Sequence, residues 1–152
     1  MAAQETIHAT CVVVGEGGVL IRGPSGAGKS SFARDLLTAA RHAGMFARLV
    51  SDDRTRITVR AGRLLAQAPE AIAGRIEVRG VGILRTDYET SVVVRLVVDL
   101  STDAPPRLPP EGADTVALCG VMVPRIRHRR GASLCDVVLG RLSGLGDTLV
   151  TV

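Results

Sequence analysis

Aromatic side chains are nearly absent from this sequence, which has no tryptophan, one tyrosine and two phenylalanines among 152 residues. Because 46% of the residues are nonetheless apolar, the core has to be built mainly from valine, leucine, isoleucine and alanine, as is usual for buried strands of an α/β sheet. Without aromatic residues between the basic ones, base stacking is not available. This argues against binding of single-stranded nucleic acid as the main function.

Cysteines and long apolar runs are also scarce. Cys11, Cys119 and Cys135 are odd in number and lack C-x-x-C spacing, so they indicate neither a disulfide framework nor a zinc site and fit a reducing compartment. Residues 1–8 contain no basic region followed by an apolar run, and no stretch of about 18 apolar residues occurs. We therefore expect no signal peptide and no membrane span, and predict one domain, residues 1–152, of a cytoplasmic protein.

The net charge of +4 and the pI of about 9.6 suggest acidic or phosphorylated partners. Arginines are spread along the chain except for a cluster at Arg125, Arg127, Arg129 and Arg130. A local anion site at this cluster is favoured over a general nucleic-acid surface. The alternative is that nucleotide phosphates and a solvated arginine surface account for the charge.

Lysine is rarer still, because Lys29 is the single lysine among 19 basic residues. It belongs to a G-x-x-x-x-G-K-S stretch, the phosphate-binding P-loop, and the residues expected to contact ATP are Gly23, Pro24, Ser25, Gly26, Ala27, Gly28, Lys29, Ser30 and Ser31. In such a loop backbone N–H groups cradle the phosphates, lysine reaches the β- and γ-phosphates as a point charge, and the serine hydroxyl ligates Mg²⁺.

The surroundings of this loop predict a mixed α/β domain with antiparallel hairpins. Residues 19–22 form a strand before it and residues 29–42 a helix after it, which Gly44 ends. Further strands are expected at 10–14, 47–51, 56–60, 63–67, 75–84, 91–100 and 116–123, a turn or short helix at 69–74, a helix at 133–142, and an edge strand at 149–152. Strands follow one another in hairpins with few helices between them, unlike a doubly wound sheet.

Asp52 and Asp53 end the predicted strand at residues 47–51, where P-loop proteins often place a metal-binding carboxylate. Two adjacent carboxylates with opposed directions allow one to face the metal and the other to act as a general base on a substrate hydroxyl. The alternative is a turn in which aspartate caps the backbone.

Glu77 and Arg79 lie in a run that also contains Gly80 and Gly82. Glycines in a strand indicate a bulge or close approach of the backbone to a ligand. The carboxylate could complete a Mg²⁺ shell and the guanidinium could contact phosphate, but a solvent-facing ion pair at alternate strand positions is an equal alternative.

Taken together, these residues resemble the catalytic domain of bacterial HPr kinase/phosphorylase, in a short form without an N-terminal domain, from about Ile7 to Leu142. Four features carry the resemblance: Ile7-His8-Ala9, the P-loop, Leu49-Val50-Ser51-Asp52-Asp53, and the signature run Ile76-Glu77-Val78-Arg79-Gly80-Val81-Gly82-Ile83, like the family's E-I-R-G-L-G-I. The resemblance implies a fold like that of phosphoenolpyruvate carboxykinase and transfer of phosphate from ATP to a serine of the phosphocarrier protein HPr. It also implies the reverse reaction, in which inorganic phosphate attacks phosphoserine, and assembly into a hexamer.

By the same resemblance, His8 and Lys29 are active-site residues, Ser30 and Glu77 are Mg²⁺ ligands, and one of Asp52 and Asp53 is the catalytic base. Arg107 is similar to a catalytic arginine of an R-L-G element. The family's P-V-x-x-G-R-N loop, linked to the phosphorylase direction, aligns with Arg127-His128-Arg129-Arg130-Gly131 and the two residues after them, where the final Arg-Asn is missing. The kinase reaction is therefore the main expectation. The alternatives are a P-loop kinase of a small metabolite and a nucleotide-dependent sensor with little turnover.

Overall fold

The structure is a computed structural model that describes residues 4–102, 114–129 and 131–143. Within these residues the elements are, in chain order, β1 (Gln4–His8), β2 (Thr10–Val14), β3 (Gly17–Arg22), α1 (Lys29–His42), β4 (Ala47–Ser51), β5 (Arg54–Arg60), β6 (Arg63–Gln67), the 3-10 helix η1 (Glu70–Ile72), β7 (Arg75–Val78), β8 (Gly82–Arg85), β9 (Val92–Leu100), β10 (Thr115–Leu118), β11 (Val121–His128) and α2 (Ala132–Leu142).

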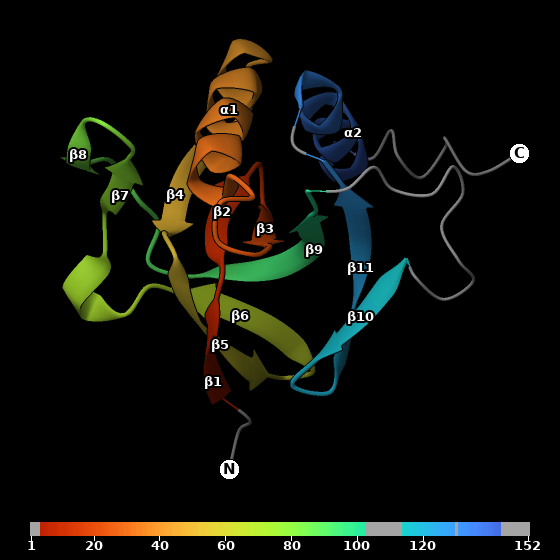
Figure 1. Cartoon of the computed structure of the whole chain (residues 1–152). Coiled ribbons are helices and arrows are strands. Elements are labelled where there is room, and N and C mark those ends of the chain that lie inside the picture. The colour runs from red at the N-terminus through yellow and green to blue at the C-terminus, as the bar shows by residue number, and fades with distance from the viewer. Residues whose placement is uncertain (1–3, 103–113, 130, 144–152) are drawn as a thin grey trace, which may run out of the picture.

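The described strands form one large mixed sheet and a separate two-stranded hairpin, β7–β8 (Figure 1). The large sheet has the order β1-β5-β6-β9-β3-β2-β4, and β11 pairs with β9 and with β10. Strands β3, β9 and β11 are parallel to one another. Strand β4 also runs in their direction, since β2 is antiparallel to both β3 and β4. The carboxyl ends of these four strands therefore meet at one edge, which is where ligands bind in open α/β sheets.

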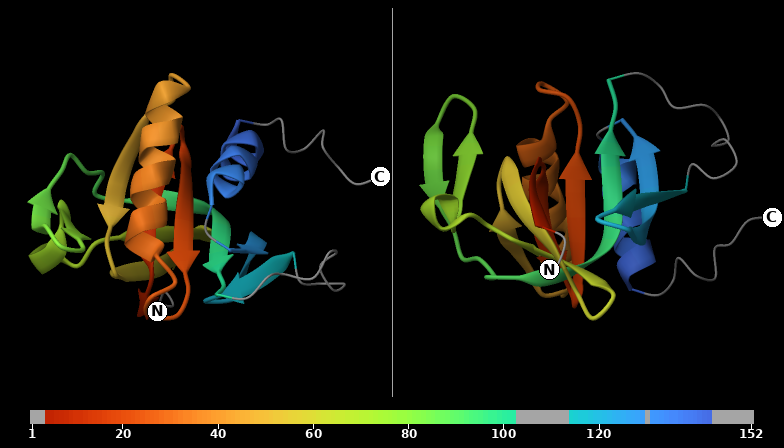
Figure 2. Two further views of the ribbon diagram at one scale, coloured as in Figure 1. Left: turned by 45° about the horizontal axis from the view of Figure 1, so that its top comes forward. Right: turned by 90° about the horizontal axis from the view of Figure 1, so that it is seen from below.

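Helices α1 and α2 lie side by side over one face of this sheet (Figures 1 and 2). Helix α1 buries Phe32, Ala33, Leu36, Leu37 and Ala40, a spacing that places them on one helical face against the strands. On the other face, β5 and β6 curl beneath the strands and enclose a second apolar cluster. Both clusters consist almost wholly of aliphatic residues, as composition predicts, and Phe32 is the aromatic member.

The predicted α/β class with antiparallel hairpins is confirmed. The helix at residues 29–42, the strands at 10–14, 47–51 and 63–67, and the turn at 61–62 lie where the sequence predicts them. Strand β1 was not expected. Of the expected elements, the edge strand at 149–152 falls outside the described residues.

Two predicted strands are wrong because each is a hairpin. The signature run turns at residues 79–81, where Gly80 has φ of 81° and the Val81 amide donates to the Val78 carbonyl at 2.9 Å. The run at 116–123 likewise turns at Cys119, which has φ of 49°, and Gly120. Alternating apolar residues are the same in one long strand and in two short strands joined by a tight turn, so periodicity cannot tell them apart.

No helix among the described residues has the length and hydrophobicity needed to cross a lipid bilayer.

Candidate active site

The P-loop leaves the carboxyl end of β3 and leads into α1. Gly28 precedes the helix with φ of 91°, a left-handed conformation that other residues adopt only with strain, and its carbonyl accepts the Phe32 amide at 2.8 Å. Gly23 lies against β9, since a Cβ at this position would come within 2.9 Å of the Leu100 carbonyl oxygen. The loop is thus held against the sheet and leads directly into the N-terminus of α1, a favourable place for an anion.

Lys29 opens the helix and is largely buried, with 8% of its surface exposed. Its ammonium donates a hydrogen bond of 2.9 Å to the Gly23 carbonyl oxygen, so the side chain reaches back across the loop. This places the one lysine of the chain in the middle of the predicted phosphate cradle.

Asp52 is buried at the end of β4 and its carboxylate connects three parts of the molecule. Oδ1 accepts hydrogen bonds from the Ser30 hydroxyl at 2.6 Å and the Thr10 hydroxyl at 3.0 Å, and Oδ2 accepts the Glu77 amide at 2.9 Å. Ser30 belongs to the P-loop helix and Glu77 to the signature hairpin. Asp52 therefore faces the predicted metal ligands.

Asp53 points the other way. Its side chain is 62% exposed, and His8 Nε2 lies 2.6 Å from its Oδ1. Its φ of 67° is left-handed, a conformation that aspartate tolerates better than most residues. Because of this turn in the backbone, the Asp53 side chain points away from that of Asp52. The Asp53 amide donates to the Thr10 hydroxyl at 3.1 Å. Thr10 thus supports both aspartates, a role that sequence reasoning missed although a polar residue at the start of the apolar run Thr10-Cys11-Val12-Val13-Val14 could have indicated it.

A hollow of about 400 Å³ brings most of the predicted residues together. Its lining consists of His8, Ser25, Gly26, Gly28, Lys29, Ser30, Ser31, Asp53, Glu77 and Arg79. They come from β1, the P-loop, α1, the turn after β4 and the β7–β8 hairpin. Glu77 and Arg79 do not form the ion pair considered as an alternative, since no salt bridge joins them. We call this hollow the phosphate pocket. Its volume is in the range usual for small-molecule sites.

The basic run predicted to be a loop is partly a strand. Arg127 and His128 belong to β11 and pair with Asp99 and Leu100 of β9, because the parallel register continues to the end of β9. Arg129 follows as an exposed residue, and Gly131 precedes α2. Arg107 and Arg130 lie outside the described residues.

A charged cluster lies beside the start of the P-loop. Sequence reasoning named Arg125 as part of a local anion site but missed its protein partner, Asp99. Arg22 donates two hydrogen bonds to Asp99, from Nε at 2.8 Å and from a terminal nitrogen at 2.9 Å. Arg125 reaches the same carboxylate at 3.4 Å. Arg22 ends β3, Asp99 lies next to the last residue of β9 and Arg125 lies within β11, so the cluster ties the strand from which the P-loop departs to its neighbours. A bidentate pair of this kind is geometrically specific.

Replacing Asp99 with asparagine should lower the free energy of unfolding by about 1–3 kcal/mol, because two partly buried guanidinium groups lose their shared charged acceptor. Urea unfolding followed by circular dichroism measures the change. The control is Glu89→Gln in the more exposed Arg48–Glu89 pair at 3.2 Å, which should cost about 1 kcal/mol at most. Equal effects of the two substitutions would contradict a specific role of the Asp99 cluster.

The cysteines take no part in the site. Burial raises the pKa of the Cys11 thiol far above its usual value, and desolvation raises the pKa values of Cys119 and Cys135 as well. None of the three lines the phosphate pocket. Cys11 and Cys135 are ordinary buried thiols, whereas Cys119 lies in a turn.

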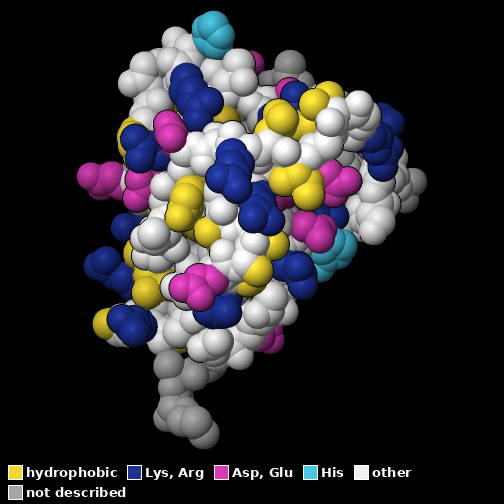
Figure 3. All heavy atoms as spheres, turned by 90° about the vertical axis from the view of Figure 1, so that its left-hand side faces the viewer, with side chains coloured by type: hydrophobic (Ala, Val, Ile, Leu, Met, Phe, Trp, Pro, Cys, Tyr) yellow, Lys and Arg dark blue, Asp and Glu magenta, His cyan; other side chains and the backbone are white. Residues whose placement is uncertain are grey.

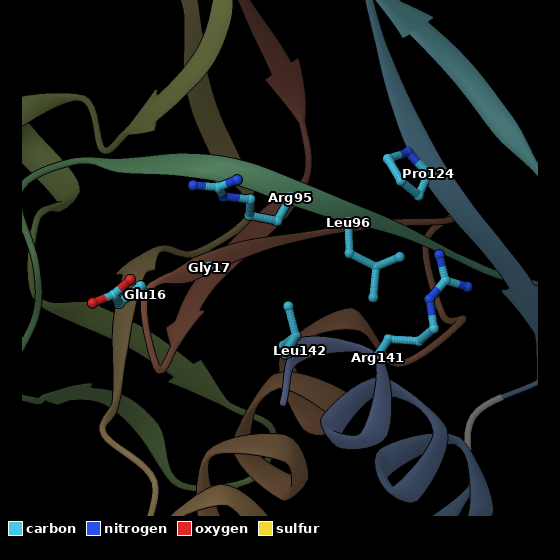
Figure 4. Close-up of a pocket in the computed structure, with 7 residues that line it drawn as sticks. All are labelled: Glu16, Gly17, Arg95, Leu96, Pro124, Arg141 and Leu142. Atoms are coloured by element: carbon cyan, nitrogen blue, oxygen red, sulfur yellow. The ribbon is translucent and has the colours of Figure 1, made fainter. Parts of the chain in front are cut away.

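Another hollow, of about 440 Å³, opens at the far end of β3 (Figure 4). Leu96 and Leu142 point into its middle, while the arginines of its lining, Arg95 and Arg141, lie to either side. Gly17 lies at its edge and begins β3, whereas the P-loop follows the last residue of that strand. No predicted site residue lines it, so it is separate from the phosphate pocket.

Comparison with known proteins agrees with this geometry. The family model described as "HPr Serine kinase C-terminal domain" matches residues 1–107. The chain belongs to this family. A protein named HPr kinase/phosphorylase from Limosilactobacillus reuteri is 33% identical over an alignment of 138 residues that covers 83% of this chain and 41% of that protein. One of the same name from Clostridium beijerinckii is 37% identical over 97 residues, or 62% of this chain and 30% of that protein.

A solved structure described as the Hpr(Ser) kinase/phosphatase from Coxiella burnetii superposes with a TM-score of 0.73 at 25% identity. The match covers 95% of this chain and 99% of that one. The curled mixed sheet with its P-loop helix is therefore the fold of this family. The chain spans only 41% of the length of the L. reuteri relative. The activity of that whole protein is therefore a proposal for this chain.

Proposed function

We propose that this protein is an ATP-dependent serine kinase whose acceptor is an HPr-like phosphocarrier protein. The observation that carries the proposal is that the two adjacent aspartates lie in different environments. Asp52 is buried and hydrogen bonded to the P-loop serine, while Asp53 is exposed in the phosphate pocket beside His8. This is the arrangement that phosphoryl transfer to a hydroxyl requires, with one carboxylate for the metal side and one for the nucleophile.

In this proposal Asp53 accepts the proton of the serine hydroxyl as its oxygen forms a bond to the γ-phosphorus of ATP. The bond from that phosphorus to the bridging oxygen breaks, and ADP leaves. His8 orients the Asp53 carboxylate through their 2.6 Å contact. Lys29 turns its ammonium from the Gly23 carbonyl toward the phosphates, where charge accumulates in the transition state.

The residues present fit Mg²⁺. The Ser30 hydroxyl and the Glu77 carboxylate are hard oxygen donors lining the pocket, and Asp52 is hydrogen bonded to Ser30. No cluster of three metal-ligating side chains occurs among the described residues, and Mg²⁺ in kinases is held by one or two carboxylates together with substrate phosphates. The ion would neutralise charge on the β- and γ-phosphates.

Replacing Glu77 with glutamine should raise the Mg²⁺ concentration needed for half-maximal activity about tenfold, because one charged ligand is lost. The hydrogen bond from the backbone amide of residue 77 to the Asp52 carboxylate is retained. A metal titration at saturating ATP measures the shift. Arg79→Gln, which changes a neighbouring side chain of the same pocket, is the matched comparison and should leave the metal dependence unchanged. An unaltered titration for Glu77→Gln would remove this residue from the metal shell.

The proposed function is tested by incubating the protein with ATP, Mg²⁺ and HPr and measuring the mass of the acceptor. We expect one added phosphate on a serine. The reverse reaction is tested with phosphoserine-HPr and inorganic phosphate, which should regenerate HPr and release pyrophosphate. We expect it to be slower than the kinase reaction, since the final Arg-Asn of the family loop is missing. Phosphate on a small metabolite instead of HPr would favour the metabolite kinase.

The same proposal includes ATP and Mg²⁺ as cofactors, residues 1–152 as one catalytic domain and a hexamer as the assembled form. Use of ATP and a phosphocarrier protein implies action in the cytoplasm. Light scattering of the purified protein measures the assembly, and binding of a fluorescent ATP analogue separates a kinase from a protein that does not bind nucleotide.

A further inference from the structure

Two junctions between strands lie beside the carboxylates of the site. Strand β1 pairs with β5, whereas β2, which follows after the single residue Ala9, pairs with β3 and β4. The second junction is formed by Asp52 and Asp53, the two residues that connect β4 to β5. The Thr55 hydroxyl joins the two junctions by donating a hydrogen bond of 2.8 Å to the Ala9 carbonyl oxygen.

A β-bulge in β4 immediately precedes the aspartates. The register between β2 and β4 shifts after the Cys11–Ser51 pair, so that Val50 is an additional residue on β4. Bulges next to active sites change the direction of the side chains that follow them and interrupt the ladder of backbone hydrogen bonds. Contacts from other segments are therefore needed to fix the direction of the two carboxylates.

The Thr10 side chain makes such contacts. It is fully buried and lies on the face of β2 that carries Val12 and Val14, which is the face covered by α1. Its hydroxyl oxygen accepts the Asp53 amide at 3.1 Å and lies 3.0 Å from Oδ1 of Asp52. A hydroxyl has a single proton, which here is donated to the Asp52 carboxylate because the Asp53 amide is itself a donor. Thr10 thus connects the carboxylate of one aspartate to the backbone of the other.

The backbone of Asp53 has a conformation that requires support. Its φ of 67° is sparsely populated by residues other than glycine and persists only where the surroundings impose it. The side chain is exposed beside His8, and a histidine lies next to acidic side chains on the face that carries the β7–β8 hairpin (Figure 3). Loss of the Thr10 hydroxyl would remove the acceptor of the Asp53 amide and one donor to Asp52.

We propose that Thr10 is a positioning residue for phosphoryl transfer. Through the Asp53 amide its hydroxyl holds the turn that directs the general base into the phosphate pocket, and through Asp52 it ties this turn to the carboxylate on the metal side. Thr10 does not line the phosphate pocket, so it acts on the chemical step through the aspartates and not on substrate binding. This inference rests on the proposed kinase function and adds a residue that keeps the two aspartates in different roles.

The test compares Thr10→Val, Thr10→Ser and Thr55→Val in the whole protein. Valine keeps the shape of threonine without the hydroxyl, whereas serine keeps the hydroxyl. Thr55→Val is the matched control, because Thr55 is equally buried and also loses a hydrogen bond, but one to the Ala9 carbonyl rather than to an aspartate. Steady-state kinetics with ATP and HPr measure kcat and both KM values, and urea unfolding measures stability. Hydrogen exchange of the Asp53 amide, followed by NMR, measures the support of the turn independently of any reaction.

We expect Thr10→Val to lower kcat about 10–100-fold, because a misplaced base is costly even when the substrates still bind. Both KM values should stay within twofold, and the Asp53 amide should exchange at least tenfold faster than in the wild type. Thr10→Ser should restore both properties. Thr55→Val should keep kcat within threefold, even where its loss of stability equals that of Thr10→Val.

A kcat of Thr10→Val within threefold of wild type would overturn the inference. An equal loss in Thr55→Val would do the same, since it would indicate a general disturbance of the junctions, as would failure of Thr10→Ser to recover kcat. Should Thr10→Val not fold, Thr10→Cys takes its place, because a thiol is only a weak hydrogen-bonding group, and the same loss of kcat is expected. If exchange of the Asp53 amide depends on Thr10 but no phosphate reaches HPr, the support of the turn by Thr10 stands and the proposed kinase function fails.

Discussion

Replacing Lys29 with arginine should lower the rate of phosphoryl transfer by about 10²–10³-fold, although the positive charge is kept. The ammonium occupies a nearly closed position, 8% exposed and 2.9 Å from the Gly23 carbonyl. A planar guanidinium group is larger, has donors in a fixed fork and cannot fit as a point charge between loop and phosphates. Initial rates with HPr at saturating ATP measure the loss.

The control for this prediction is Arg34→Lys, on the exposed side of α1, which should leave the rate within twofold. Urea unfolding should show that Lys29→Arg changes the free energy of unfolding little, which would exclude unfolding as the cause of the lower rate. A variant within a few-fold of wild-type activity would contradict the assignment of Gly23 to Ser30 as the phosphate-binding loop.

Replacing Asp53 with asparagine should lower turnover by about 10²–10⁴-fold and leave binding of ATP intact, because a general base is removed while the phosphate cradle is untouched. Asparagine has the same shape and also tolerates a φ of 67°, so the fold should not suffer. Single-turnover kinetics with HPr separate the chemical step from binding.

Asp52→Asn provides the matched comparison. This carboxylate accepts three hydrogen bonds, and the side-chain amide of asparagine cannot accept all of them. The free energy of unfolding should therefore fall by about 1–3 kcal/mol, and the Mg²⁺ concentration needed for half-maximal activity should rise. The two variants should thus differ in kind. Equal turnover of Asp53→Asn and wild type would remove Asp53 as the base, and a purely catalytic effect of Asp52→Asn would reverse the roles of the two aspartates.

The sequence predicts the local parts of the site well. The P-loop, its strand and helix, and the aspartates at the end of β4 follow from short-range patterns of glycine, apolar residues and charge. These features depend on residues that are close together in the chain, so a short stretch of sequence is enough to predict them. The hairpin that turns at Ala61 and Gly62 is predicted for the same reason. The hairpin before the P-loop is also predicted, but its turn is shorter than the expected residues 15–18, because Gly17 and Gly18 belong to β3.

What the sequence could not predict are contacts between distant segments. The role of Thr10 depends on aspartates 42 and 43 residues away, and Arg22 meets Asp99 across 77 residues. Which of the two aspartates is buried depends on the left-handed turn at Asp53 and on the docking of Glu77. Such pairings follow from sheet order, which propensity and periodicity do not determine.

The hydrogen bond from the Glu77 amide to Asp52 has a consequence for the β7–β8 hairpin. A two-stranded ribbon is only marginally stable by itself, and this hairpin is not paired with the large sheet. Its position therefore depends partly on a carboxylate that also accepts a hydrogen bond from Ser30 at the start of α1. Tilting of the hairpin would withdraw Glu77 and Arg79 from the phosphate pocket together. A phosphate-bearing ligand that binds at Ser30 would thereby also stabilise the docked position of the hairpin, and this coupling would be reciprocal.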